Sequence, residues 1–426
     1  MGESLLIKGG RLIDPAQNVD EILDVLLEEG RVKRIGKSIS GGGRTIQAKG
    51  LWVTPGLIDM HVHLREPGRT DKEDIESGSR AAVAGGFTAV ASMANGDIPV
   101  DNEAVVGYVL ARAKEVGLCR VHPIGAVTKG LRGEELAEMG LMAQAGAVAF
   151  SDDGQPIMSS RVMRRALEYS KMLGRPIISH CEDATLTRPD GVMNEGAPAM
   201  ALGLKGMPGV AEEIMVSRDI ALARHTGGRL HVAHVSTLHA VEAVRYAKRA
   251  GVHVTCEATP HHLAVTEEAM VGYSGGFKMN PPLRTGADVD AVIQGLADGT
   301  IDVIASDHAP HTVDEKTDEV TRVPFGVVGL ETTVGVVLTR LVHEGRLTPA
   351  RAVAAMTVQP ARQLGVNRGT LAQGADADVT LIDPAAEWTC EPAQFVSKAR
   401  ATPFEGWTLK GRAIMTIVGG RVVFER

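Results

Sequence analysis

The feature that most restricts the fold of this chain is a repeated alternation between short apolar runs and helical patterns. The eight apolar runs read "LIDMHVHL", "FTAVASM", "VHPIGAVT", "AVAFSDD", "RPIISHC", "LHVAHVS", "HVTCEATP" and "DVIASDHA". Between most of them lie amphipathic stretches such as "SSRVMRRALEYSKMLG" and "DVDAVIQGLADG", often ending in a glycine that suits a helix C-terminus. Eight such units over about 250 residues predict an α/β fold, a (β/α)8 TIM-like barrel. A doubly wound open sheet is the rival, but no glycine-rich phosphate loop follows the first run.

Both ends of the chain are rich in strand patterns. "LLIKGGRLID" and "LLEEGRVKRIG" predict strand pieces around glycine turns, and Gly419-Gly420 predicts a hairpin near the C-terminus. Neither end alone is large enough for its own core. We therefore expect residues 1–54 and 366–426 to pair into one small β-sandwich domain, with the barrel of residues 55–365 inserted between them.

Composition narrows the class of protein. The 426 residues carry a net charge of −7, which disfavours nucleic acid and anionic membrane surfaces as partners. No apolar run approaches the length of a membrane span, and "MGESLLIKGG" lacks the order of a signal peptide. The four cysteines are scattered without a C-x-x-C pair, which favours a reducing cytoplasm over a disulfide framework.

Metal-ligating residue types follow five of the apolar runs. They are His61 and His63 after the first run, Asp152 and Asp153 after the fourth, His180 after the fifth, His234 after the sixth and Asp307 after the eighth. In a barrel the C-terminal ends of all strands meet at one face, where active sites are built. Six imidazole and carboxylate ligands are too many for one tetrahedral site, so the pattern predicts two metal ions bridged by a shared carboxylate.

Some neighbouring residues have plainer interpretations. His231 stands three positions before the sixth-run ligand and faces the other way, so we interpret it as a core histidine. His261 and His262 either support the ligands from behind or simply pack. Asp152 and Asp153 are adjacent, so only one of them can face the site on an extended strand, and either could instead cap the helix that follows "DDGQP".

Six motifs together resemble a known family. "HVHLREPG", "FSDDG", "SHCED", "HVAHVST", "KMNPPLR" and "SDHAPH" occur with the order and spacing of class I dihydroorotases in the amidohydrolase superfamily, and the resemblance covers essentially the whole chain. It implies reversible cyclisation of N-carbamoyl-L-aspartate to dihydroorotate in pyrimidine biosynthesis. Hydroxide generated at a binuclear zinc centre would attack the ring carbonyl, and Asp307 would act as general acid and base.

The resemblance also implies a ligand set for two Zn²⁺ ions per chain. One ion would be held by His61, His63 and Asp307, the other by His180 and His234, and Asp153 would bridge them. Many superfamily relatives use a carbamylated lysine as the bridge instead. The fourth run ends "AFSDD" without a lysine, and Lys129, in the loop after the third run, is best interpreted as a solvated loop residue.

The every-other spacing of the first run puts Arg65 on the face of His61 and His63. Three such donors need partners, and a guanidinium fork suits a carboxylate. The resemblance implies that Arg65 binds the carboxylate of the substrate. The other substrate-binding positions that it implies are His63, Asn95, Asn280, His311 and the backbone of Phe325 and Gly326.

Two stretches raise further expectations. The family usually reads close to "PMPNT" around the substrate-binding asparagine, whereas this chain reads "SMANGDIP", with Gly96 and Asp97 after it. An added negative charge there would weaken binding of an anion if it pointed inward. The polar stretch 311–326 predicts a mobile lid over the site, and a disordered surface loop is the alternative.

Two other functions compete with this interpretation. A dihydropyrimidinase or hydantoinase would open uncharged cyclic amides, would not need Arg65 and would carry the lysine bridge. A catalytically silent partner of aspartate transcarbamoylase would lack metal ligands, whereas all six positions are intact here. An active site that matures only beside aspartate transcarbamoylase remains open, and the family implies a homodimer.

Overall fold

Eight parallel strand segments form a closed ring at the centre of the protein. The structure is a computed structural model that describes residues 4–426, so the first three residues of the predicted range 1–54 lie outside the described residues. Seven of the segments are regular strands: β6 Leu57–Val62, β7 Phe87–Ser92, β8 Arg120–Pro123, β9 Ile177–Ser179, β12 Leu230–Val232, β13 Val254–Ala258 and β14 Val303–Ile304. They form two sheets, ordered β6-β7-β8 and β9-β12-β13-β14.

Single bridges join these two sheets into a barrel. The fourth segment pairs only through Phe150, which bridges Gly125 on one side and Ile177 on the other. On the far side, Val62 bridges His308 in parallel, which closes the ring between the first and eighth segments. All eight apolar runs therefore take barrel positions, and the (β/α)8 prediction is confirmed over the open-sheet rival.

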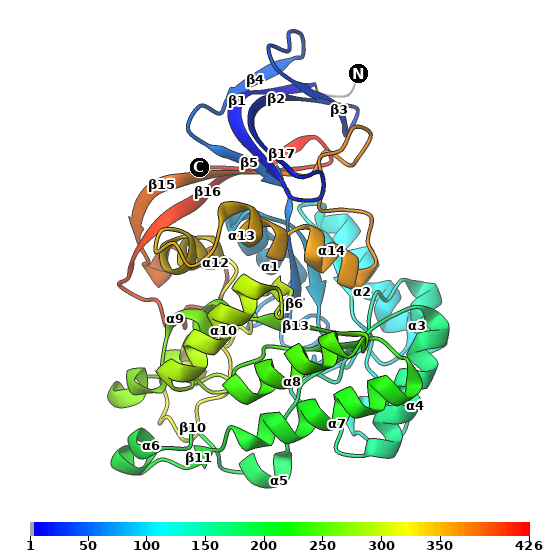
Figure 1. The fold of residues 1–426 in the computed structure, drawn as a ribbon, viewed down its shortest axis with the longest axis vertical. Helices are drawn as coiled ribbons and strands as arrows, with labels where there is room; N and C mark the ends of the chain where they lie inside the picture. The colour runs from blue at the N-terminus through cyan, green and yellow to red at the C-terminus, as the bar shows by residue number, and fades with distance from the viewer. Residues whose placement is uncertain (1–3) are drawn as a thin grey trace.

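Helices cover the outside of the barrel (Figure 1). The longer ones are α1 Ile75–Ala84, α2 Glu103–Val116, α3 Met139–Ala145, α4 Ser160–Leu173, α7 Val210–Thr226, α8 Leu238–Arg249, α10 Gly286–Asp298, α13 Pro349–Ala355 and α14 Val358–Leu364. Shorter elements lie in the loops: α5 Ala184–Thr187, α6 Ala197–Leu202, α9 Pro260–Ala264, α11 Val313–Lys316, α12 Thr333–Val337, β10 Met193–Asn194 and β11 Gly206–Met207. Single turns occupy Lys129–Leu131, Glu267–Gly272, Gly275–Phe277 and Pro392–Gln394, and Leu338–Val342 is a π-helical segment.

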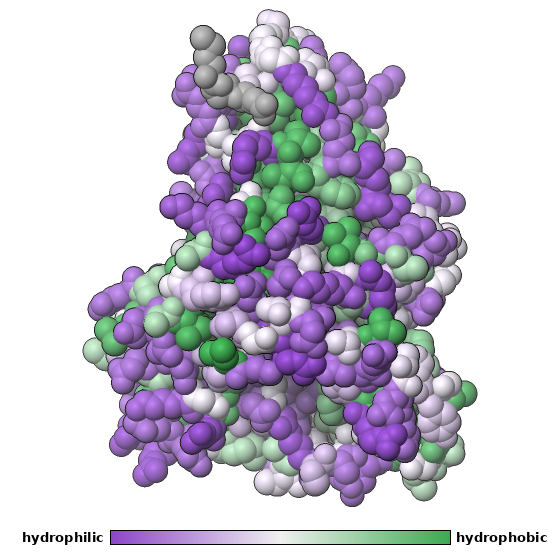
Figure 2. Space-filling view, turned by 180° about the vertical axis from the view of Figure 1, so that it is seen from behind, coloured by the Kyte–Doolittle hydropathy of each residue, from purple (hydrophilic) through white to green (hydrophobic). Residues whose placement is uncertain are grey.

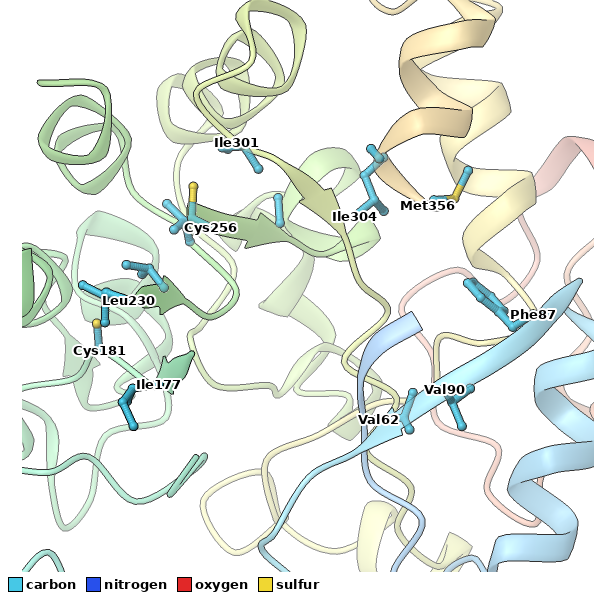
Figure 3. Close-up of a cluster of buried hydrophobic side chains, with 14 of the residues drawn as sticks. Val62, Phe87, Val90, Ile177, Cys181, Leu230, Cys256, Ile301, Ile304 and Met356 are labelled. Carbon is cyan, nitrogen blue, oxygen red and sulfur yellow. The ribbon is translucent and has the colours of Figure 1, made fainter. Parts of the chain in front are cut away.

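The barrel strands separate two hydrophobic layers. Ile58 and Met60 of β6 point inward and pack with Ala89 and Ala91 of β7 in a small interior cluster. Other strand residues belong to a larger cluster that also contains helix residues, and Figure 3 shows Val62, Phe87, Val90, Ile177, Leu230 and Ile304 among its members. Because both faces of these strands are buried, the runs read as almost continuous apolar stretches in the sequence.

The two ends of the chain meet in a second sheet, as predicted. Its strands are β1 Leu5–Asp14, β2 Val19–Glu28, β3 Arg31–Gly36, β4 Arg44–Gln47, β5 Trp52–Pro55, β15 Val379–Thr389, β16 Thr408–Val418 and β17 Arg421–Glu425. The order is β17-β16-β15-β5-β1-β2-β3, with β4 paired to β1. Figure 1 shows the blue and red strands together at the top. Gly419 and Gly420 turn the predicted hairpin, both with positive φ.

One local prediction in this sheet is wrong. "LLIKGGRLID" is a single strand, β1, and does not split at its two glycines. The register of β1 against β2 shifts between Ile7 and Gly10, which is a bulge rather than a turn. Gly10 lies so close to the neighbouring strand that a Cβ there would be 2.4 Å from a methyl group of Val53. The glycines therefore serve close packing inside a strand.

The surface is mostly hydrophilic. Figure 2 shows charged and polar residues over most of one face, with a group of hydrophobic residues running down its upper half. In the part of the chain that the structure describes, no helix combines the length and the apolar character needed to cross a bilayer.

Asp14 ties the two ends of the chain together, and its loss should weaken the whole protein. Its fully buried carboxylate accepts hydrogen bonds from Leu371 N (2.7 Å) and the Thr370 hydroxyl (2.9 Å). Asp14→Ala leaves these donors unpaired, so we expect the free energy of unfolding to fall by about 2 kcal/mol. Asp20→Ala, which breaks only the exposed pair with Arg11, should cost less than about 1 kcal/mol. Urea titration measures both, and equal losses would contradict the assigned role of Asp14.

Candidate active site

The candidate ligands lie at the C-terminal ends of the barrel strands, as the sequence predicts. His61 and His63 belong to the end of β6, Asp153 follows the fourth segment, His180 follows β9, His234 follows β12 and Asp307 follows β14. All six side chains are buried, with at most 7% of each residue exposed. Strands that are far apart in the sequence thus bring six ligand-type residues to one end of the barrel.

Asp153 lies between two pairs of histidines. Its Oδ2 is 3.5 Å from Nε2 of both His61 and His63, and its Oδ1 is 3.3 Å from Nε2 of His234 and 3.7 Å from Nδ1 of His180. Asp307 Oδ1 closes the first group, at 3.4 Å from His61 Nε2 and 3.1 Å from His63 Nε2. The structure therefore contains two groups of ligand atoms that share one carboxylate.

Three of the four histidines are oriented through their other ring nitrogen. His61 Nδ1 pairs with Glu257, His63 Nδ1 lies 2.6 Å from Asn95 Oδ1, and His180 Nε2 lies 2.8 Å from Glu182 Oε2. An acceptor at one nitrogen fixes the ring and leaves the lone pair of the other nitrogen facing the site. This arrangement is typical of histidines that bind a metal.

The donor set fits divalent metal ions. Among the described residues, His61 Nε2 is buried with no hydrogen-bond partner, although it points at two carboxylates. An unsatisfied buried nitrogen of this kind is costly unless it has a ligand. Imidazoles and carboxylates are the ligands that zinc and related ions prefer.

The charges of the site favour bound cations. Burial raises the pKa of Asp153, but the surrounding histidines outweigh it and hold this pKa well below the usual range. Burial lowers the pKa of His180, yet Asp153 and Glu182 raise it to about 9. Burial also lowers the pKa of His63, which leaves that ring neutral. Ionised carboxylates that draw protons onto nearby rings will also attract a metal ion, which competes with those protons.

Three residues of the site have left-handed backbone conformations. Arg65, His234 and Asp307 have φ angles of 57°, 32° and 48°. Such angles cost roughly 1–3 kcal/mol for residues other than glycine and concentrate at functional sites. The surrounding barrel therefore holds these three side chains in directions that a relaxed strand would not give them.

Asp152, the neighbour of Asp153, has a structural role. Its Oδ1 accepts hydrogen bonds from Val127 N (2.7 Å) and Thr128 N (3.0 Å), so it anchors the loop after β8. The suggestion that one of the two aspartates caps the next helix is wrong, because α4 is capped by Ser159. Lys129 pairs with Glu135 at 2.7 Å on the surface, as expected for a solvated lysine.

Three further buried histidines, His231, His261 and His262, lie near the candidate ligands. His231 faces away from the candidate ligands and is 3.2 Å from Glu257, the residue that orients His61. His262 Nε2 donates to the carbonyl of Pro281, next to Asn280. His261 is buried beside it, and burial lowers its pKa to about 4.

A cavity of about 350 Å³ opens beside the ligands. Its lining includes every residue of the predicted substrate-binding set: His63, Arg65, Asn95, Asn280, His311, Phe325 and Gly326. Arg65 donates through Nε to the carbonyl of Pro310 (3.1 Å). Within residues 4–426, no carboxylate lies in ion-pair range of its guanidinium, and burial lowers its pKa to about 10. A half-buried guanidinium without a carboxylate partner favours an anionic ligand.

Sequence reasoning missed two residues at the rim of this cavity. Glu182 accepts from His180 and, at 2.6 Å, from Asn280 Nδ2, so one carboxylate connects a candidate metal ligand to a candidate substrate-binding residue. Arg188 bonds Glu182 and the carbonyl of Gly154 (2.8 Å). Glu182 stands two residues after His180 in "SHCED", and that alternate spacing was the available signal.

The packing of the two unusual stretches, residues 92–99 and 311–326, shows whether each of them faces the cavity or the solvent. Asp97 is exposed and does not line the cavity, so its charge is not aimed at the ligand. Stretch 311–326 is not a disordered surface loop, because it starts with the short helix α11 and buries Val320 and Val323. The many polar residues of this stretch hid the burial of these two valines in the sequence. The motion of the stretch as a lid stays a prediction.

Comparisons with known proteins agree with this geometry. A sequence profile described as "Dihydro-orotase-like" matches residues 50–240. Curated proteins named dihydroorotase match almost end to end. The one from Pelotomaculum thermopropionicum is 55% identical over 99% of this chain and 98% of its own length. The one from Geobacter metallireducens is 53% identical over 99% of this chain and its whole length.

Solved structures show the same fold. The L-hydantoinase (dihydropyrimidinase) from Arthrobacter aurescens has a TM-score of 0.89 at 28% identity, and the match covers 100% of this chain and 96% of that one. The fold is therefore shared with cyclic amidases, while the full-length sequence identity lies with proteins named dihydroorotase. The chain belongs to the dihydroorotase family.

Proposed function

We propose that this protein is a class I dihydroorotase that interconverts dihydroorotate and N-carbamoyl-L-aspartate. The observation that carries the proposal is the position of Arg65. Its guanidinium, which has no carboxylate partner among the described residues, lines the same cavity as the candidate metal ligands, so an anionic cyclic amide could be held with its ring at those ligands. The relatives named dihydroorotase support the same reaction at 52–55% identity.

The chain's own residues would hold two Zn²⁺ ions. His61, His63 and Asp307 would bind one, His180 and His234 the other, and Asp153 would contribute one carboxylate oxygen to each. Bound there, the metal pair would supply hydroxide at neutral pH and polarise the carbonyl of the ring. Glu257, Asn95 and Glu182 would keep the histidine rings in place.

The rest of the cavity would orient the substrate and move protons. Arg65, Asn95 and Asn280 would bind its polar groups, together with His311 and the backbone at Phe325 and Gly326. The carboxylate of Asp307 lines the cavity and is ionised at neutral pH, because nearby histidines lower its pKa. It would take a proton from the attacking water and pass it to the departing ring nitrogen. In the reverse direction the same carboxylate would take the proton from the carbamoyl nitrogen as that nitrogen attacks the side-chain carboxyl carbon, and would give it to the departing hydroxide, which leaves as water.

Two other functions are less well supported. A hydantoinase or dihydropyrimidinase acting on uncharged rings shares the fold, but it would have no use for Arg65, and we assign the bridging position to Asp153 rather than to a lysine. A silent partner of aspartate transcarbamoylase would not need six buried ligands with oriented rings. We further propose a cytoplasmic homodimer, in line with four free, buried cysteines, and an association with aspartate transcarbamoylase remains to be tested by co-purification.

The central test is ring opening of dihydroorotate by the purified, zinc-loaded protein, with dihydrouracil as the uncharged comparison. We expect turnover of dihydroorotate, loss of activity after chelation and recovery when Zn²⁺ is returned. Chromatography of substrate and N-carbamoyl-L-aspartate measures both directions. Faster turnover of dihydrouracil would contradict the assignment of Arg65, and turnover of neither compound would favour the partner-dependent or silent alternatives.

The substitution Asp153→Asn should remove the carboxylate that the two proposed metal ions share. We expect the variant to bind less metal than the wild type and to lose about 10³-fold or more in activity, with an unchanged circular dichroism spectrum. Asp152→Asn is the matched control, because its carboxylate bonds only backbone and hydroxyl groups of residues 127–128. It should keep its metal, as measured by mass spectrometry of the purified protein. Equal metal content in the two variants would exclude the bridging role.

Arg65→Met should separate charged from uncharged substrates. Removing the guanidinium should lower kcat/KM for dihydroorotate by about 100-fold, the cost of roughly 3 kcal/mol of charged hydrogen bonding. Activity on dihydrouracil should change little by comparison. Arg69→Met, on the same loop but outside the cavity, should behave like the wild type. A similar loss on both substrates would mean that Arg65 only maintains the structure.

A further inference from the structure

Two buried lysines hold the loop that forms one wall of the cavity. Lys316, at the end of α11, is 7% exposed, and its Nζ lies 2.8 Å from the carbonyl of Gly326, 3.0 Å from that of Pro324 and 3.2 Å from that of Lys278. The side chain thus joins both ends of residues 316–326 to each other and to the segment before Asn280.

Lys278 makes the reciprocal contact from that segment. Its Nζ donates to the carbonyls of Val320 (2.7 Å) and Thr321 (3.1 Å) and lies 4.8 Å from the centre of the Phe325 ring. Gly326 N also donates to the carbonyl of Lys278 at 3.0 Å. Each lysine therefore grips the backbone of the other segment, and we call the two side chains together the lysine clamp.

The clamp needs charged lysines. In the described part of the chain, neither Nζ has a carboxylate within ion-pair distance. Burial and the nearby charge of Lys278 lower the pKa of Lys316 to about 7, although Glu315 acts to raise it. Only an ammonium can donate to three carbonyls at once, because a neutral amine has two hydrogens. The three carbonyl dipoles therefore favour the charged form that burial disfavours.

Both segments that the clamp joins line the cavity. Asn280 lies two residues after Lys278, while Phe325 and Gly326 close the loop that begins near His311. His311 Nε2 donates to the carbonyl of Phe325 at 2.8 Å, so the loop backbone also sets the position of that ring. A shift of the loop would move His311, Phe325 and Gly326 together, without touching a candidate metal ligand.

We propose that Lys316 and Lys278 are positioning residues that fix the 311–326 loop against the Asn280 segment and so determine how tightly the cavity binds its substrate. The proposal rests on the assigned dihydroorotase reaction for its kinetic consequence, but not for its structural one. Val320 and Val323 already anchor the loop by hydrophobic burial. The two ammonium groups also fix the orientation of the loop, because each Nζ donates to particular backbone carbonyls.

The test compares Lys316→Met with Arg322→Met. Methionine keeps most of the length and burial of the side chain but cannot donate. Arg322 is on the same loop, 67% of its side chain is exposed, and it pairs only with Asp318 and Glu319. In Lys316→Met we expect amides of residues 316–326 to exchange hydrogen about tenfold faster or more, the factor for one charged hydrogen bond. KM for dihydroorotate should rise about tenfold while kcat stays within about threefold. Arg322→Met should change neither quantity.

Other outcomes separate the two proposals. Unchanged exchange in the loop, or acceleration spread evenly over the barrel, would overturn the positioning role. Unchanged KM with faster loop exchange would overturn its link to substrate binding. If the wild type does not open dihydroorotate, the proposed reaction fails, and hydrogen exchange still decides the clamp. If Lys316→Met does not fold, Lys316→Gln provides the same two measurements, and Lys316→Arg should recover part of the binding.

Discussion

The carboxylate of Asp153 is the contact on which the site depends. Its two oxygens face two different histidine pairs, one from β6 and one from the ends of β9 and β12. These elements belong to the two sheets of the barrel, which meet at Phe150 and at the bridge between Val62 and His308. The polar cluster therefore lies across the junction of the two sheets. A metal pair bound there would link the two halves of the barrel as well as supply the chemistry.

Charge outside the ligands is arranged around the same cavity. Glu257 and Glu182 bond histidine rings on the side away from the ligand centre, while Arg65 faces the cavity without a carboxylate partner. Negative charge thus supports the metal ligands and positive charge is left for the substrate. The lysine clamp adds two further cations close to the cavity wall, although they act through backbone carbonyls. This separation would allow one small site to hold the proposed metal ions and an anionic substrate side by side.

Much of this arrangement could be predicted from the sequence. The eight apolar runs predicted the barrel, and the polar residues directly after each run predicted which side chains meet, since parallel strands end at one face. The small sheet and its Gly419-Gly420 hairpin followed from turn and strand patterns. Local errors arose where two structures share one pattern. The pair Gly9-Gly10 is compatible with either a turn or a bulge. The pairing of β1 with β2 shows that it is a bulge, and the close approach of Val53 requires glycine at position 10. Stretch 311–326 looked exposed because its few buried residues are spread among polar ones.

The sequence by itself determined the fold class and the set of residues available for the site, because alternation and strand-end position are periodic properties of the chain. It did not decide which of the adjacent Asp152 and Asp153 faces the histidines. That choice was made by contacts from elsewhere, since the amides of Val127 and Thr128 hold Asp152 and leave Asp153 free to point inward. Tertiary structure likewise decided the roles of Glu182, Lys278 and Lys316. Their partners lie on other segments, and a hydrogen bond between distant segments leaves no periodic trace in the sequence.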